Sequence, residues 1–422
     1  MLSIFKFFFR GYGNIPIFYK IFAGFAIGIA LGAIFGEAVV GMQFLGTIMV
    51  RLISLVVIPL VVCMMVVAVG EVGGKSMGKM GGLTTLIFTI STPFAIAIGL
   101  FFAFLFNVGA GIPAPDIVNG AVAAAGAPTF IETLVNIVPN NIFMAMSTAN
   151  LLQVMTFSIL IGVAISAMNN RGHAFILIEW FKSFNEIMQK ILGYAMGFMP
   201  FGVMGIMAWL VGSHGIAALF PFASFIFAIY AKTLAIFFIV QVLFMVRILG
   251  GYNMVNYLKA IKEPILFSYA TNSSWATLPL AMASAKKLGI KDKIASFVVP
   301  YGIVINMDGS ASYLAVATVF VANVFGIHLG IHEMLMIIIA ATLGSFGAAG
   351  TPGAAVVMLN AILLMLGLPI EGVALLIGFD RLLIGPARSV LNMNGDLAVC
   401  TIVQRFVKEE PEDEEKPAEQ LA

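Results

Sequence analysis

The sequence of 422 residues contains few charges, few cysteines and no cluster of basic side chains. Only 10% of its residues are charged, whereas an average soluble domain is about a quarter charged. So little charge cannot cover a water-facing surface, and a soluble globular protein is therefore excluded. Two cysteines rule out a disulfide framework and a cysteine zinc site. Without a basic patch, nucleic acid is excluded as a partner.

Hydrophobic residues make up 61% of the chain and indicate a multi-pass protein of the lipid bilayer. Because a helix needs about 20 apolar residues to cross the hydrocarbon core, each run of that length predicts a span. Six such runs come first: residues 17–35, 42–70, 81–106, 141–168, 192–211 and 219–246. The first run lacks a cleavage site followed by a soluble protein, so we expect it to be retained as a span.

Basic residues orient these spans, because Lys and Arg gather in cytoplasmic loops. Lys6, Arg10 and Lys20 place the N-terminus inside, and no Lys or Arg occurs from 81 to 170. The later basic clusters then alternate so that every second span ends inside. We therefore predict a plasma (inner) membrane protein with both termini in the cytoplasm.

Two later segments do not fit a simple span. Residues 263–284 contain Pro264 and Pro279 and have basic residues on both flanks, which a re-entrant hairpin from the cytoplasm satisfies. Residues 334–368 have a glycine-rich centre and no basic residue at either end, which predicts a second hairpin from the opposite side. The alternative is that both centres are kinks in full spans, which places four lysines on the wrong side.

Residues 295–324 and 373–403 are the last two predicted spans. The prediction is therefore an all-α membrane protein with eight transmembrane helices and two opposed re-entrant helical hairpins. Broken segments at matching positions point to the substrate site of a transporter. The end of the chain, residues 409–422, holds seven of the 20 acidic residues and almost nothing apolar, so we expect it to be disordered.

Polar and ionisable residues inside the spans are costly to bury and therefore indicate function. Arg388, Asn392 and Asp396 follow at intervals of four, so they share one face of the last span. Asn306 and Asp308 add oxygens in the preceding span. Carboxylate and amide oxygens suit an alkali cation, and a planar guanidinium suits a carboxylate. These residues indicate a cation and an anion as cargo, unless the aspartates are paired structurally with arginines of the last span.

At these positions the sequence resembles the dicarboxylate/amino acid:cation symporter family, which includes glutamate, aspartate and C4-dicarboxylate transporters. The resemblance covers the whole chain except the acidic tail, and it rests on four motifs. They are Thr271-Asn-Ser-Ser-Trp-Ala-Thr-Leu-Pro279, Asn306-Met-Asp-Gly-Ser310, Gly347-Ala-Ala-Gly-Thr-Pro-Gly353 and Arg388-Ser-Val-Leu-Asn-Met-Asn-Gly-Asp396.

The resemblance implies a set of substrate contacts and three cation sites, with sodium as the co-transported ion and no other cofactor. The implied substrate residues are Ser274, Ser310, Thr351, Gly353, Arg388, Ser389 and Asn392. The first cation site would use Gly302, Asn306, Asn392 and Asp396, and the second Ser91, Thr92, Asn306 and Asp308. The third would use carbonyls near Val304 and Ser345. Arg388 would meet a distal carboxylate.

The resemblance also implies a homotrimer of two-part subunits. Residues 1–80 and 107–218 would form a static scaffold, the latter with an extracellular loop. Residues 81–106 and 219–408 would form a transport domain that slides like an elevator, with the second hairpin as its outer gate. Residues 409–422 would remain a disordered acidic tail.

The substrate residues depart from the family pattern in two ways. Family members that bind amino acids have an aspartate three residues before the substrate arginine, where this chain has Gly385. One additional residue lies between Asp380 and Arg388, and Pro386 predicts a kink or bulge there. Without a carboxylate for an ammonium group, we expect a C4-dicarboxylate such as succinate, fumarate or malate. A sodium- or proton-coupled glutamate or aspartate symporter is the alternative.

Two other functional classes explain fewer of these residues. An intramembrane aspartyl protease would pair Asp308 with Asp380, but it leaves Asn306, Arg388 and the hairpins without a role. A channel lined by the same segments would conduct, but a sodium gradient could not drive its flux uphill. Lys232, in the sixth predicted span, has no role in this prediction. We therefore expect a sodium-coupled symporter and not an enzyme.

Overall fold

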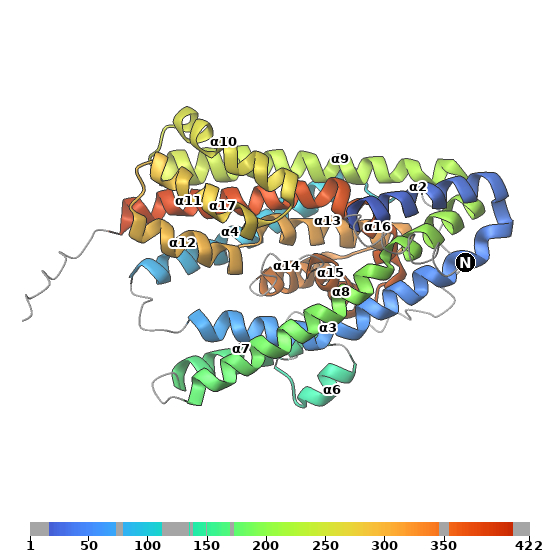
Figure 1. The fold of residues 1–422 in the computed structure, drawn as a ribbon, viewed down its shortest axis with the longest axis horizontal. Helices are drawn as coiled ribbons and strands as arrows, with labels where there is room; N and C mark the ends of the chain where they lie inside the picture. Colours follow the sequence, from blue (N-terminus) through green and yellow to red (C-terminus); the bar gives the residue numbers. More distant parts are fainter. Residues whose placement is uncertain are drawn as a thin grey trace, which may run out of the picture.

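The computed structural model describes residues 17–72, 79–111, 135, 138–148, 150–168, 173–345 and 354–407. Within these residues the regular structure is helical, without strands (Figure 1). This agrees with the apolar composition, because a helix satisfies its backbone hydrogen bonds internally, as a segment in lipid must. The predicted acidic tail, residues 409–422, lies outside the described residues.

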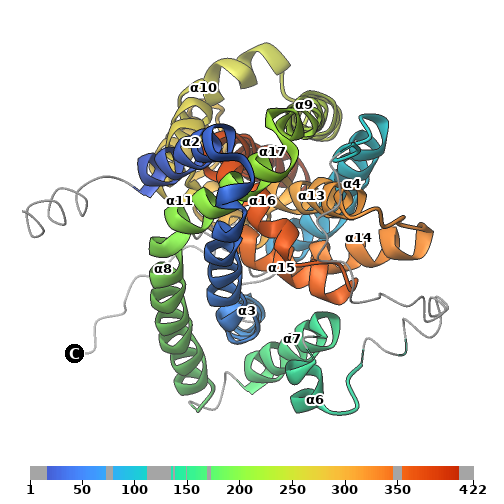
Figure 2. The ribbon, with the colours of Figure 1, turned by 90° about the vertical axis from the view of Figure 1, so that its right-hand side faces the viewer.

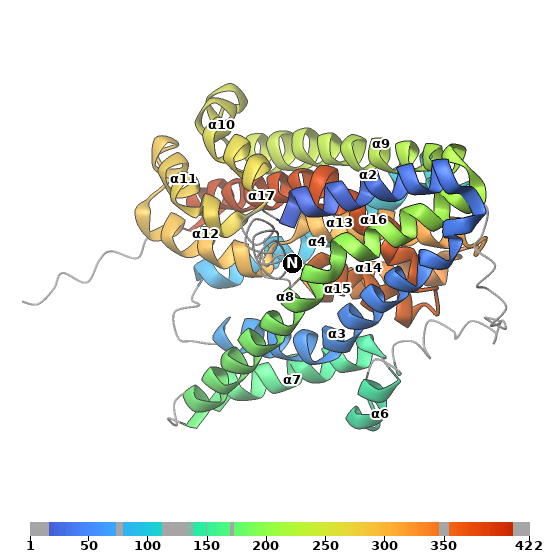
Figure 3. The same cartoon turned by 45° about the vertical axis from the view of Figure 1, so that its right-hand side comes forward.

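One group of helices comes mainly from the first half of the chain (Figure 3). Its members are α2 (Ile17–Phe35), the short 3₁₀ helix η1 (Gly36–Met42), α3 (Gln43–Val72), α6 (Ile142–Ser147), α7 (Leu151–Met168) and α8 (His173–His214). α8 packs along α2 and α3, and α7 packs on α3. Small residues allow this close approach, since a Cβ at Gly24 or Gly28 would overlap the backbone of α8.

Five continuous helical stretches among the described residues are long and apolar enough to cross a membrane. They are Tyr19–Val67, Met80–Leu105, Ile176–His214, Phe220–Leu249 and Asp292–Val324. α8 has 42 residues and is therefore about 63 Å long at 1.5 Å per residue. It begins at His173, well before the predicted start at residue 192, because the basic residues in its first half do not interrupt the helix.

The second group surrounds α13 and α17, which lie in the interior of the bundle when it is viewed end-on (Figure 2). It contains α4 (Lys79–Leu105), η5 (Ile216–Leu219), α9 (Phe220–Ala235), η6 (Ile236–Leu249), α10 (Met254–Thr271), α11 (Ser274–Lys287), α12 (Asp292–Ile305), α13 (Asp308–Val324), α14 (Ile331–Ser345), α15 (Ala354–Met365), α16 (Glu371–Phe379), η7 (Asp380–Ile384) and α17 (Gly385–Phe406). η6 and η7 are π-helical. Residues 385–403 of α17 are buried throughout.

The first predicted hairpin is a pair of helices, α10 and α11, that pack against each other. The chain reverses at Asn272, which adopts the left-handed conformation with φ 52° and ψ 37°, a region where Asn is several-fold enriched. Ser273 then caps α11 by accepting a hydrogen bond from the Ala276 N–H at 3.2 Å. A single kinked helix over this segment is therefore wrong.

The second predicted hairpin corresponds to α14 and α15, which also contact each other. The segment between them, residues 346–353, lies outside the described residues. In Figure 1, α10 and α11 lie at the left end of the molecule, whereas α14 and α15 lie near its middle, below α13.

The seventh predicted span is broken at its polar motif. α12 ends at Ile305 and α13 begins at Asp308. Between them Asn306 is extended, with φ −100° and ψ 96°. The break exposes backbone groups inside the bundle, where they are available to a ligand.

The last predicted span contains a π-helical turn, η7, where a bulge was expected. The Gly385 N–H donates to the carbonyl of Asp380, five residues earlier. Pro386 has no N–H and its ring crowds the carbonyl four residues before it, which disfavours a regular α-helix at this point. The wider turn takes up one additional residue.

Candidate substrate and cation site

Asn306 and Asp396 form a pair of oxygens suited to a cation. The Asn306 amide donates to Asp396 Oδ1 at 2.9 Å, and both side chains are fully buried. Their other oxygens, Asn306 Oδ1 and Asp396 Oδ2, are buried and have no hydrogen-bond partner among the described residues. Gly302 adjoins them, since a Cβ there would overlap Asp396 Oδ1. Buried acceptors without partners are costly, so this arrangement fits a cation that would bind both.

Asp308 forms a second cluster with two hydroxyl groups from α4. Thr92 Oγ1 donates to Asp308 Oδ1 at 2.7 Å, and Ser91 Oγ donates to the same oxygen at 3.3 Å. Asp308 is the first residue of α13, where the helix dipole favours a negative charge. Asn306, expected in this cluster as well as the first, donates its amide to Asp396 and keeps its Oδ1 without a partner among the described residues.

Asn392 holds the start of α13 against α17. Its Oδ1 accepts a hydrogen bond from the Gly309 N–H at 2.8 Å, and its Nδ2 lies 3.4 Å from Ser310 Oγ. Asn392 and Ser310 therefore come together as the family resemblance implies. The expected contact of Asn392 with the first cation stays a prediction.

Arg388 is buried and makes an ion pair with Asp380. Its Nη2 donates to Asp380 Oδ2 at 3.2 Å, and Nη1 lies 3.0 Å from Oδ1. Both terminal nitrogens of the guanidinium therefore face the Asp380 carboxylate. The guanidinium also lies 4.8 Å from the ring centre of Tyr313. Structural pairing of Arg388 with Asp308 or Asp396, the alternative left open by the sequence, is therefore wrong.

The π-helical turn explains why Asp380 and Arg388 meet. The two residues are eight apart, which in a regular α-helix turns their side chains about 80° away from each other. Because η7 takes up one residue, they are related as residues seven apart, two turns that leave an offset of only about 20°. The sequence did not indicate how closely these two side chains align.

Ser268 of the first hairpin and Ser389 of the last span are in contact. Ser389 Oγ lies 2.6 Å from Ser268 Oγ of α10. Ser274 is buried at the first position of α11. Thr351 and Gly353, the other expected substrate residues, lie outside the described residues.

The third expected cation site lies partly outside the described residues and stays a prediction. Ser345 is buried at the end of α14, and its hydroxyl donates to the Thr342 carbonyl at 2.7 Å. Val304 lies in the last turn of α12 and is half-buried. The segment that follows Ser345 is outside the described residues.

The sequence analysis missed a buried polar chain behind the first cation site. Gln241 of η6 donates to the Leu391 carbonyl at 3.0 Å and accepts from Asn394 Nδ2 at 2.8 Å. Tyr257 Oη in turn donates to Asn394 Oδ1 at 2.9 Å. Gln241 stands alone in an apolar run, and such an isolated amide is the signal that could have identified this chain.

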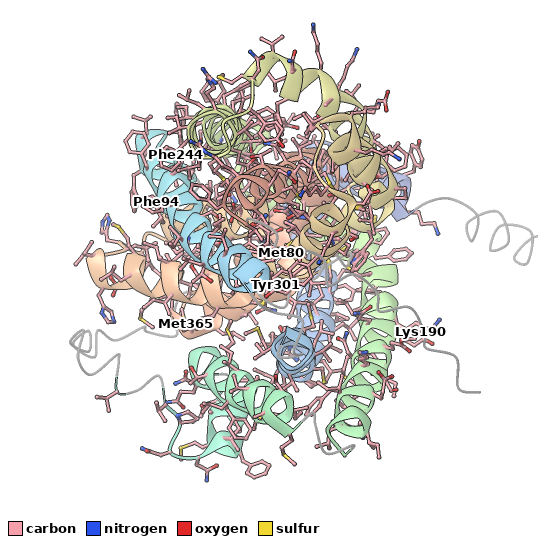
Figure 4. All side chains as sticks on the ribbon, turned by 90° about the vertical axis from the view of Figure 1, so that its left-hand side faces the viewer. Met80, Phe94, Lys190, Phe244, Tyr301 and Met365 are labelled. Carbon is pink, nitrogen blue, oxygen red and sulfur yellow. The ribbon has the colours of Figure 1, made fainter. Side chains whose placement is uncertain are left out.

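An apolar groove of about 410 Å³ lies between α4 and η6. Phe94 and Phe244 belong to its lining (Figure 4), as does Ser91, whose hydroxyl binds Asp308. An almost wholly apolar lining cannot solvate an ion, so this groove does not form a route for the cation.

Comparisons with known proteins agree on one family of transporters. The family model described as the sodium:dicarboxylate symporter family matches residues 17–406. The proton/sodium-glutamate symport protein of Bacillus caldotenax is 35% identical over 420 residues, which cover 97% of this chain and 98% of that protein. The C4-dicarboxylate transport protein of Bacillus subtilis (strain 168) is 33% identical over 384 residues, 89% of this chain and 90% of that protein.

These matches extend over nearly the whole chain and include each described residue of the two cation clusters and of the Arg388 site. They also confirm the prediction of a transporter. The alternative of an intramembrane protease, in which Asp308 and Asp380 would act together, is therefore wrong. The chain belongs to the sodium:dicarboxylate symporter family.

Proposed function

We propose that this protein is a sodium-coupled symporter that imports a small C4-dicarboxylate. One observation carries the proposal: α17 holds the buried guanidinium of Arg388 and also Asp396, which together with Asn306 at the break between α12 and α13 presents free, buried oxygens. The guanidinium, now paired with Asp380, suits a carboxylate, and the free oxygens suit a hard cation. Binding of the cation offsets the charge of the anion, which couples the two cargoes.

The position of Gly385 supports a substrate without an amino group. A Cβ at Gly385 would overlap Asn272 Nδ2 at the turn of the first hairpin. The amide of Asn272 therefore occupies the space that a carboxylate side chain at position 385 would need. A site without that carboxylate offers less to an ammonium group, and a site built for one substrate rejects an analogue that leaves its polar groups unpaired.

Sodium is favoured over the proton as the coupled cation by the number of oxygens. Ser91, Thr92 and Asp308 form one cluster, and Asn306 and Asp396 form another. A proton needs only one acceptor, whereas a sodium ion is surrounded by several hard oxygen donors. The clusters therefore favour co-transported sodium ions.

An acidic amino acid is the second candidate substrate. Relatives named proton/sodium-glutamate symport protein are 35% and 31% identical to this chain, and the second is from Bacillus subtilis (strain 168). Asp380, which pairs with Arg388, is a carboxylate that an ammonium group could meet instead. Proton coupling belongs to this second candidate as well.

The proposed transport cycle follows the two groups of helices. Residues 1–80 and 107–218 form the scaffold, and residues 81–106 and 219–408 form a transport domain that moves as an elevator. Eight spans, two re-entrant hairpins and a homotrimer in the plasma (inner) membrane, with cytoplasmic termini, complete this proposal. The packing of α8 on α2 and α3, and of α12 and α13 on α17, supports the division into two bodies.

The first experiment compares uptake of labelled succinate and labelled aspartate into proteoliposomes under a sodium gradient. We expect uphill accumulation of succinate, with little inhibition by excess aspartate, and no increase when a proton gradient is added. Accumulation of aspartate instead would establish the second candidate and contradict the dicarboxylate proposal. Uptake that never exceeds equilibrium would contradict symport itself.

A further inference from the structure

Lys232 of α9 is a fully buried cation that the proposed binding sites do not use. Its Nζ donates to Ser312 Oγ at 2.6 Å and to the Gly309 carbonyl at 3.2 Å. Ser312 Oγ itself donates to the Asp308 carbonyl at 2.7 Å, so it acts as an acceptor toward Lys232. No carboxylate of the described residues lies within ion-pair distance of Lys232.

The contacts of Lys232 place its charge at the centre of the binding region. Gly309 is held on its other side by Asn392, which also contacts Ser310. Lys232 therefore binds the first turn of α13, which begins at Asp308 of the second cation cluster, without forming part of either proposed site.

Acidic groups outnumber basic groups among the described side chains of this region. Asp308, Asp380 and Asp396 are buried acidic groups, and Lys232 and Arg388 are buried basic groups. A net charge in a low-dielectric interior is costly, and a dicarboxylate adds two more negative charges. Co-transported cations must compensate the remaining negative charge before the loaded protein can move its cargo across the membrane.

We propose that Lys232 is a built-in cation that takes the place of one co-transported cation. The inference rests on the proposed symport function and deepens it by assigning a residue that sets the cation-to-substrate ratio. With Lys232 charged, the loaded site needs one cation fewer than it would need with a neutral residue at this position. The ammonium is fixed to Gly309 and Ser312, so it remains in the protein throughout the cycle.

The test is the number of cations moved per substrate, obtained from the membrane potential at which uptake into proteoliposomes reverses. Three variants are compared with the unmodified protein. Lys232→Gln keeps the hydrogen-bond donors and removes the charge, Lys232→Met keeps the approximate length alone, and Lys232→Arg keeps the charge. Lys190→Met is the matched control, because Lys190 is exposed on α8, away from α13 (Figure 4).

We expect the neutral variants to move one more cation per substrate than the unmodified protein, with a steeper dependence of uptake on sodium concentration. Lys232→Arg and Lys190→Met should keep the original ratio. An unchanged ratio in a folded Lys232→Gln protein would overturn the inference while leaving symport intact. Failure of both neutral variants to fold, with Lys232→Arg folding normally, would also overturn it, since the role of Lys232 would then be structural. If the unmodified protein shows no sodium-driven uptake, the proposed function itself fails.

Discussion

At the scale of single residues, the site combines free, buried acceptors with a buried ion pair. Asn306 Oδ1 and Asp396 Oδ2 have no hydrogen-bond partner among the described residues, and Arg388 pairs with Asp380. Each free acceptor costs about 1–3 kcal/mol, or more when charged, so the two together indicate a cation that satisfies them. The cation and the anion would then stabilise the same part of the protein.

The carboxylate of Asp396 leads to a prediction about sodium affinity. In Asp396→Asn, one charge and one acceptor for the cation are lost, so we expect the sodium concentration for half-maximal uptake to rise by about 10–100-fold, the range seen when metal-site residues are changed. Sodium-dependent uptake in proteoliposomes measures this change. Glu263→Gln is the control, because Glu263 is exposed and pairs only with the exposed Lys287. An unchanged sodium dependence in Asp396→Asn would remove Asp396 from the cation site.

The contact of Gly385 with Asn272 leads to a prediction about specificity. Gly385→Asp alone should destabilise the turn of the first hairpin, because the new side chain overlaps Asn272. The double variant Gly385→Asp with Asn272→Gly removes the overlap and keeps a residue that tolerates the left-handed conformation at position 272.

We expect this double variant to gain inhibition of succinate uptake by aspartate, by about tenfold or more in the inhibitory concentration, since a charged hydrogen bond contributes about 1.5–3 kcal/mol. The Asn272→Gly single variant is the control for the change at the hairpin. Inhibition by aspartate that is equal in the single and double variants would show that position 385 does not face the substrate.

At the scale of secondary structure elements, two irregular segments build the site. The break between α12 and α13 places Asn306 and Asp308 at non-helical and helix-terminal positions. The π-helical turn η7 aligns Asp380 with Arg388. Both irregularities follow from local chemistry, but their effect depends on α17 being enclosed by its neighbours.

The π-helical turn predicts where a deletion is tolerated. Deleting Leu383 would let η7 become α-helical, which keeps Asp380 and Arg388 on one face at a spacing of seven residues. It also removes the carbonyl that accepts from Tyr230 at 2.8 Å, a loss of about 1 kcal/mol. We expect this variant to fold and to retain sodium-driven uptake.

Deleting Val390 provides the comparison, because it rotates Asn392 and Asp396 by one residue relative to Arg388 and should abolish uptake. Thermal unfolding in detergent and uptake in proteoliposomes distinguish the two deletions. Equal loss of folding in both would contradict the role assigned to η7.

At the scale of the whole molecule, the contact between the two groups of helices is the feature that a moving transport domain must break. Asn360 of α15 donates to Ser54 Oγ of α3 at 2.7 Å. α15 belongs to the proposed transport domain, and α3 to the proposed scaffold. A hydrogen bond of this kind fixes one relative position of the two groups, and it would be lost when one group slides past the other.

This contact can be used to arrest the proposed motion. In a Cys63→Ala, Cys400→Ala background, Ser54→Cys with Asn360→Cys should be cross-linked by mercuric ion, and uptake should fall to background until a thiol reductant removes the metal. Each single-cysteine variant should be insensitive to the same treatment. Full uptake after complete cross-linking would contradict an elevator motion at this interface.

The membrane class and the approximate bounds of most helices follow from local patterns in the chain. Long apolar runs predicted 17–35, and the helix spans Ile17–Phe35. The last span was expected at 373–403, and its helices run from Glu371 to Phe406. These predictions succeed because the length of an apolar run and the hydrogen bonds within a helix are local properties. The early start of α8 was missed, since basic residues do not end a helix.

Which polar groups meet depends on how the helices pack in three dimensions. The sequence placed Arg388, Asn392 and Asp396 on one face, but it did not show that Arg388 pairs with Asp380 or that Asn272 fills the space beside Gly385. These contacts join segments far apart in sequence or depend on a π-helical turn. The spacing of residues along the sequence determines on which face of its own helix a side chain lies. The partner of that side chain depends on the packing of several helices around α13 and α17.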